Sequence, residues 1–115
     1  MHIKDVCKKA AETSQEKGFH NGEALTSHSV TEITKALLLI HSEVSEATEL
    51  TRVETFDPKD YKDVFTKPCG FGSELADIVI RTCELAERCG IDLDGMVKLK
   101  MAYNKSRPHK HGKTY

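Results

Sequence analysis

The sequence predicts an all-α protein that folds as one four-helix-bundle-like domain over residues 1–115. Two observations support this class. Apolar residues recur at three- and four-residue spacing in four segments, and glycine or proline stands near the segment ends. No segment shows a competing strand pattern. A chain of 115 residues is expected to form one core, and oligomerisation would help to complete it.

The first half of the chain contains two of these segments. Residues 2–17 place apolar side chains at helical spacing, and Gly18 is expected to end that helix. A loop follows, because glycine and asparagine interrupt the pattern. The second helix is predicted to begin near Ser29, a suitable cap, and to run to about Arg52.

The second half opens with residues 53–70, which contain two prolines and three aspartates. They predict an irregular connection with no more than a short helical turn. A third helix is expected over residues 73–89, ended by Gly90. The fourth is expected to start after Asp92 and to end before Pro108.

Charge is balanced overall but unevenly distributed. The chain has 17 basic and 18 acidic residues, and six of the basic ones fall in residues 98–115, which contain no acidic residue. An acidic body with a basic C-terminal tail, residues 108–115 at its end, suits a protein that binds a cation in one place and an anion in another.

The four cysteines lack Cys-x-x-Cys spacing, and the polar N-terminus does not resemble a signal peptide. The longest apolar stretch, residues 36–40, is too short for a membrane span. We therefore expect a cytoplasmic protein with reduced cysteines and with Cys83 in the core. A zinc site built from Cys69, Cys83, Cys89 and a C-terminal histidine is an open alternative.

Two acidic couplets carry most of the functional information. Glu43 and Glu46 lie in one predicted helix, Glu74 and Asp77 in another, and each couplet has the i,i+3 spacing that places both carboxylates on one helix face. Four carboxylates gathered between two helices would repel by roughly 3 kcal/mol per close pair at about 5 Å. Oxygen ligands of this kind predict a hard divalent cation, Mg²⁺ or Mn²⁺.

Other interpretations of the couplets are less demanding. Each could belong to a solvated helix face, and Arg81, four residues after Asp77, could pair with that carboxylate. The second predicted helix offers no such partner, because no basic residue lies between Lys35 and Arg52. A di-iron site would add a histidine three residues after a glutamate, which neither couplet has.

The basic C-terminal segment predicts an anion-binding surface. Lys100, Asn104 and Arg107 have i, i+4, i+7 spacing and therefore share one face of the last helix. Ammonium, amide and guanidinium groups in a row suit a polyphosphate and the edge of a base. The alternative for residues 109–115 is a solubilising or nucleic-acid-binding tail.

These features together resemble the MazG-like nucleotide pyrophosphohydrolases. The likeness covers roughly residues 15–113 and rests on both couplets, on "GIDLD" and on "KMAYNKSRPHKHGK". It implies an all-α MazG-type fold in a homodimer or homotetramer. It also implies Mg²⁺-dependent cleavage of nucleoside triphosphates between the α- and β-phosphates. The residues it assigns are the metal ligands Glu43, Glu46, Glu74 and Asp77, and the substrate contacts Lys100, Asn104, Arg107 and Lys113, with His20 or Phe19 stacking on the base.

On this hypothesis a carboxylate of the cluster activates the attacking water, and Glu46 is our choice for that role. Removal of unwanted nucleotides from the pool would be the task. Two alternatives remain. One is a non-catalytic helical module whose basic C-terminus binds nucleic acid or nucleotide. Few aromatic residues lie among the basic ones, and this counts against nucleic-acid binding. The other is a helical bundle that stores a divalent ion without turnover.

Overall fold

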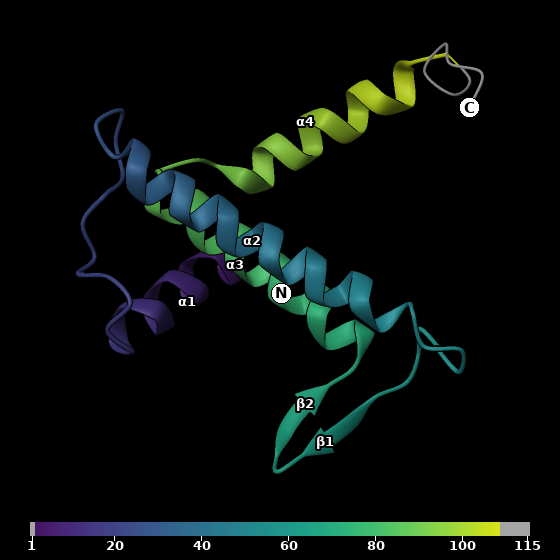
Figure 1. The fold of residues 1–115 in the computed structure, drawn as a ribbon. Helices are drawn as coiled ribbons and strands as arrows, with labels where there is room; N and C mark the ends of the chain where they lie inside the picture. The colour runs from purple at the N-terminus through teal and green to yellow at the C-terminus, as the bar shows by residue number, and fades with distance from the viewer. Residues whose placement is uncertain (1, 109–115) are drawn as a thin grey trace.

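The computed structural model describes residues 2–108 and contains four helices and one β-hairpin (Figure 1). The elements follow one another as α1 (Ile3–Glu16), α2 (Val30–Leu50), β1 (Lys62–Val64), β2 (Lys67–Cys69), α3 (Phe71–Arg88) and α4 (Leu93–Ser106). The protein is thus mostly helical, and the prediction of four helices is confirmed. None of the helices in this range combines the length and the apolar character needed to cross a membrane.

Local signals mark several helix ends. At the start of α1, the Asp5 carboxylate accepts a hydrogen bond from the backbone N–H of His2 at 3.1 Å. At the start of α4, the Asp92 carboxylate accepts one from the N–H of Gly95 at 3.0 Å. These bonds satisfy donors that a helix leaves unpaired in its first turn. At the other end of α1, Gly18 adopts a φ of 82°, which an L-residue with a side chain seldom adopts.

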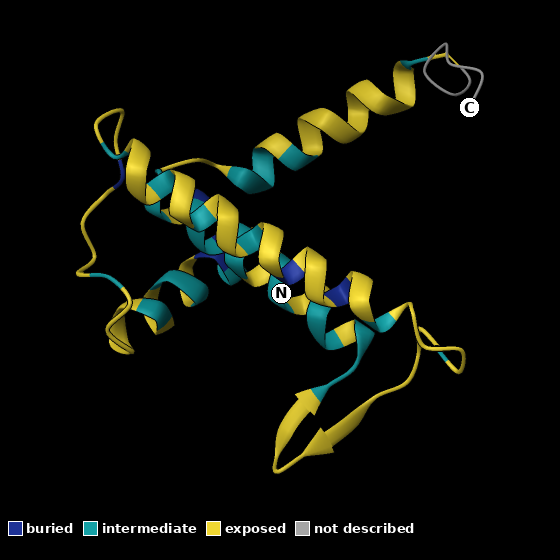
Figure 2. Ribbon diagram, viewed as in Figure 1, coloured by how far each residue is buried: buried dark blue, intermediate teal, exposed yellow. Residues whose placement is uncertain are grey.

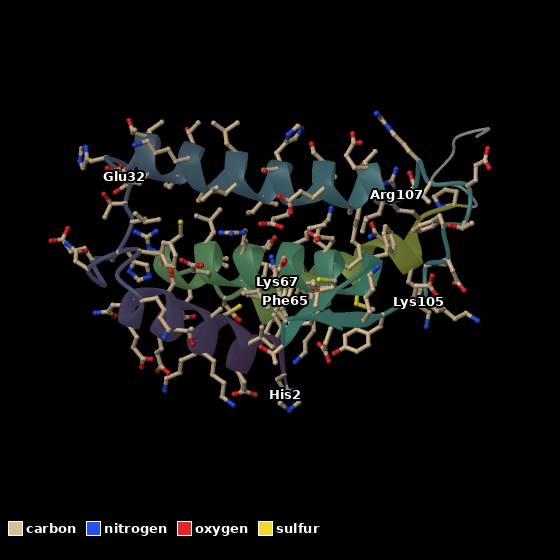
Figure 3. All side chains as sticks on the ribbon, turned by 60° about the horizontal axis from the view of Figure 1, so that its bottom comes forward. His2, Glu32, Phe65, Lys67, Lys105 and Arg107 are labelled. Atoms are coloured by element: carbon tan, nitrogen blue, oxygen red, sulfur yellow. The ribbon has the colours of Figure 1, made fainter. Side chains whose placement is uncertain are left out.

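Helix α3 is the central element. It lies between α1 and α2, contacts both, and runs antiparallel to α2 after the hairpin reverses the chain (Figures 1 and 3). Helix α4 instead points away from the other three (Figure 1). The radius of gyration is accordingly 16.8 Å, whereas a compact chain of this length would have about 13 Å. A closed bundle of four helices does not form within one chain.

The connection between α2 and α3 differs from the prediction. Residues 62–64 pair antiparallel with residues 67–69. The prediction of an irregular connection without strands was therefore wrong. The signal was weak because the two-residue turn is Phe65–Thr66, not the Asn–Gly that usually marks such a hairpin. Gly70 then joins β2 to α3 at a φ of 119°, where a Cβ would lie 2.5 Å from the carbonyl oxygen of Asp60.

The core of the single chain is small. The buried apolar residues are Cys7, Leu25, Ala47, Cys83 and Ala86, which confirms Cys83 as a core residue. Burial, followed by hydrogen bonding to Cys83, raises the pKa of the Cys7 thiol to about 12, so the thiol stays protonated. Much of the apolar surface of α2 and α4 is exposed (Figure 2), including Leu37, Leu38, Leu39, Met96, Leu99, Met101 and Tyr103.

Candidate metal centre and adjoining cavity

Three glutamates converge between α2 and α3. One carboxylate oxygen from each of Glu43, Glu46 and Glu74 lies within 4.8 Å of the others. The antiparallel helices bring the middle of α2 opposite the first turns of α3, and polar side chains lie between these helices (Figure 3). Glu43 is 8 % exposed, Glu74 is half-buried and Glu46 is exposed. The site therefore has a buried wall and an open side.

The surroundings of Glu74 disfavour the ionised form of its carboxyl. Burial is the largest cause that raises the pKa of its carboxyl, followed by hydrogen bonding to Glu46 and by the negative charges of Glu46, Asp77 and Glu43. The Oε2 atom of Glu74 is buried and has no hydrogen-bond partner among residues 2–108. An unpaired oxygen facing two further carboxylates fits a hard divalent cation such as Mg²⁺ or Mn²⁺.

Arg81 supplies a positive charge at the edge of the triad. Its Nε donates a hydrogen bond to Oε1 of Glu43 at 2.8 Å. The alternative in which Arg81 pairs with Asp77 is thus replaced by a pair between helices. Asp77 is outside the group of three converging oxygens, yet its charge acts on Glu74. It lines a neighbouring cavity instead.

This cavity has a volume of about 740 Å³ and is bounded by α1, the first half of α2 and the second half of α3. Apolar side chains such as Ala36, Leu39 and Ile80 make part of its wall. A polar stripe on α3, formed by Asp77, Arg81, Glu84 and Arg88, makes another part. Arg81 connects the two features, because it lines the cavity and also binds Glu43 of the triad.

The start of the loop between α1 and α2 forms part of the cavity wall. Phe19 lies on the wall and is otherwise exposed. The side chain of His20 is only 6 % exposed; its Nδ1 accepts the N–H of Gly22 at 3.0 Å, and its Nε2 lies 3.8 Å from Oε1 of Glu84. The loop thus places Phe19 on the cavity wall, and it places His20 in the interior against a residue of that wall.

The predicted substrate contacts on α4 lie elsewhere. Lys100 and Arg107 flank the ring of Tyr103, with their charged groups 5.2 and 5.5 Å from its centroid. Asn104 is exposed on the same helix. The cavity wall is built from α1, α2, α3 and residues 17–19, so α4 does not bring these side chains to it. Lys113 lies outside the described residues.

The zinc alternative finds no support in residues 2–108, where the three glutamates are the one group of potential ligands that converges. Cys83 is buried beside Cys7 in the core. The histidine that such a site would take from the C-terminal tail lies outside this range.

No family model, curated protein or solved structure matches this chain.

Sequence reasoning did not assign a role to Glu84 or Arg88. A signal was present, however, because Glu74, Asp77, Arg81, Glu84 and Arg88 recur at spacings of three and four residues. Such a series places all five on one face of a helix. The second acidic couplet is therefore the beginning of a longer polar stripe that runs from the triad along the cavity.

Proposed function

We propose that this protein is a divalent-metal-dependent nucleotide pyrophosphohydrolase of the MazG-like type, which cleaves nucleoside triphosphates to the monophosphate and pyrophosphate. The observation that carries the proposal is the meeting of Glu43, Glu46 and Glu74 within 4.8 Å beside a cavity of about 740 Å³. Carboxylate-rich sites that leave room for phosphate oxygens are typical of Mg²⁺ sites in phosphoryl-transfer enzymes.

The carboxylates would have different roles, metal binding or water activation, according to their exposure. Glu43 and Glu74 are the more enclosed members and would hold the metal, with Asp77 at the edge of the site. Bound Mg²⁺ would supply charge neutralisation for the triphosphate. Glu46 is the exposed member of the triad, and its carboxylate can therefore reach a water from the open side and accept its proton.

The cavity suits the rest of a nucleotide. Lys9, Lys17 and Lys35 lie on its wall together with Arg81, so the cavity offers several cationic side chains beside the triad. These groups would bind phosphate oxygens by charge-assisted hydrogen bonds. Apolar surface and the ring of Phe19 would contact the sugar and the base.

A second copy of the chain would complete this site. Helix α4 presents Met96, Leu99, Met101 and Tyr103 to solvent, and the exposed face of α2 is also rich in leucine. The free energy of folding depends on burying such surface. We propose a homodimer or homotetramer in which α4 of one copy covers apolar surface of another. Lys100, Asn104 and Arg107 would then reach the phosphates in the neighbouring copy.

The proposal is tested by incubating the purified protein with Mg²⁺ and a panel of ribo- and deoxynucleoside triphosphates while measuring pyrophosphate and monophosphate. We expect equal amounts of the two products and their loss in Glu46→Gln and Glu74→Gln. Glu49→Gln is the matched control, because Glu49 lies on the same helix as Glu46 but pairs with Arg52 at 3.2 Å. Orthophosphate as the product, or full activity in both triad variants, would refute the proposal.

A second candidate function is nucleic-acid binding through α4 and the basic segment after it. The observation that favours it is the exposure of Lys98, Lys100, Lys105 and Tyr103 on one projecting helix. Removing residues 108–115 should then weaken binding of single-stranded RNA or DNA. Triphosphate hydrolysis that continues in the shortened chain would favour the enzyme.

A further inference from the structure

The end of the cavity opposite the triad contains an unusual set of polar groups. Glu84 lines the wall with its side chain 20 % exposed, and Arg88 lines it one turn further along α3. Leu25 of the loop donates its backbone N–H to the carbonyl oxygen of Arg88 at 2.8 Å. The loop is therefore fixed against this end of α3, and the two side chains lie on an ordered surface.

Two hydrogen-bond donors at this end are buried without acceptors among residues 2–108. The side chain of His20 is more than nine-tenths buried, and its Nδ1 accepts a backbone N–H, so the remaining proton of the neutral ring is on Nε2. This Nε2 points toward Glu84 but stops 3.8 Å short, beyond hydrogen-bond length. The Nε of Arg88 is also buried and unpaired within residues 2–108. A buried donor without an acceptor destabilises the folded state.

A ligand in the cavity would match these two wall residues if it offered donors to the Glu84 carboxylate and an acceptor to the Arg88 guanidinium. His20 faces Glu84 from behind the wall and is not itself on the wall. Glu84 lies ten residues after Glu74 on α3, a rise of about 15 Å. An extended nucleotide with its phosphates at the triad would place its base in this region.

We infer that Glu84 and Arg88 form a base-recognition site and that the base they select is guanine. The inference rests on the proposed nucleotide chemistry. Guanine presents two neighbouring N–H donors, N1–H and N2–H, beside the acceptor O6, so one carboxylate can accept both donors while a guanidinium binds O6. Adenine and cytosine offer an amino group with no second donor beside it, and thymine offers a single N–H between two carbonyl oxygens.

The test compares GTP, ITP and XTP, which differ at position 2 of the base: an amino group, a hydrogen and a carbonyl oxygen. With Mg²⁺ present, kcat/KM for pyrophosphate release should fall in that order, by about 10- to 100-fold from first to last. Glu84→Gln should reduce this ratio to a few-fold. Glu87→Gln, an exposed glutamate on α3 away from the cavity wall, should leave the ratio unchanged.

Equilibrium binding of GMP, IMP and XMP to the same three proteins separates this inference from the proposed function. Tighter binding of GMP than of XMP, lost in Glu84→Gln, supports guanine recognition even if no triphosphate is cleaved. Equal affinities in the wild type, or a preference that survives Glu84→Gln, would overturn it. Thermal unfolding of each variant shows whether a lost preference comes from the site or from a lost fold.

Discussion

Arg81 on α3 donates a hydrogen bond from Nε to Oε1 of Glu43 on α2, at 2.8 Å, across the interface that holds the candidate metal centre. The arginine side chain is 41 % exposed and the glutamate side chain 11 % exposed. The pair therefore gives the more buried carboxylate of the triad a positive neighbour. It also means that a metal ion would share Glu43 with a guanidinium.

Arg81→Gln should lower the free energy of unfolding in the absence of metal by about 1–2 kcal/mol. A buried carboxylate that loses its partner is costly, but the exposure of Arg81 allows water to compensate part of the loss. The same change should increase the stabilisation by Mg²⁺, since the competing cation is gone. Urea unfolding with and without Mg²⁺ measures both effects. Unfolding curves that respond to Mg²⁺ as in the wild type would show that Glu43 is not a ligand.

The triad also predicts how stability depends on pH. Burial first, and then hydrogen bonding to Glu46 and nearby negative charge, raise the pKa of Glu74 above its usual value. A group whose pKa is higher in the folded state stabilises the fold at low pH and loses that contribution as pH rises through the raised value. The contribution of Glu74 to metal-free stability should therefore be fully present below pH 4.5, the ordinary pKa of this carboxyl, and should decline as pH rises above it.

Glu74→Gln isolates this effect, because the amide stays neutral at every pH. The free energy of unfolding of the wild type minus that of Glu74→Gln should fall as pH is raised from 4.5 to 7.5. Saturating Mg²⁺ should weaken the decline, since a bound cation favours the ionised carboxylates. A difference that is constant over this range, or that rises, would contradict the raised pKa of Glu74.

The sequence predicted the helices because their signals are local. Apolar spacing and Gly18 or Gly90 need no knowledge of the tertiary structure. The meeting of Glu43, Glu46 and Glu74 was also predicted, since each couplet occupies one face of a helix, but Asp77, the fourth predicted ligand, lies outside the converging group. The partner of Arg81 was not, because the sequence offers Asp77 four residues away and the structure uses Glu43, 38 residues away. The position of α4, which points away from the other helices (Figure 1), was not predictable either. The apolar spacing of a helix does not identify the surface against which the helix packs.

The hairpin turn offers a test of local strain. Phe65 and Thr66 have φ values of 54° and 64°, and both residues carry side chains that disfavour this region. Replacing the pair with Asn–Gly should raise the free energy of unfolding by about 1 kcal/mol, because this dipeptide suits a turn with two positive φ values. Chemical denaturation measures the change. Phe65→Ala is the control, because it removes the exposed ring but keeps the strained backbone. This variant should not raise the free energy of unfolding.

The shared site makes the sharpest prediction about assembly. If α4 of one copy serves the triad of another, Glu46→Gln and the double variant Lys100→Ala/Arg107→Ala should each be inactive, because each lacks one half of every site. Mixed and allowed to exchange subunits, they should form hetero-oligomers in which some sites have an intact triad and an intact α4. A dimer would recover about a quarter of wild-type activity. Pyrophosphate release, with sedimentation velocity to follow assembly, measures this recovery. A mixture as inactive as its components, despite proven exchange, would show that α4 does not act across the interface.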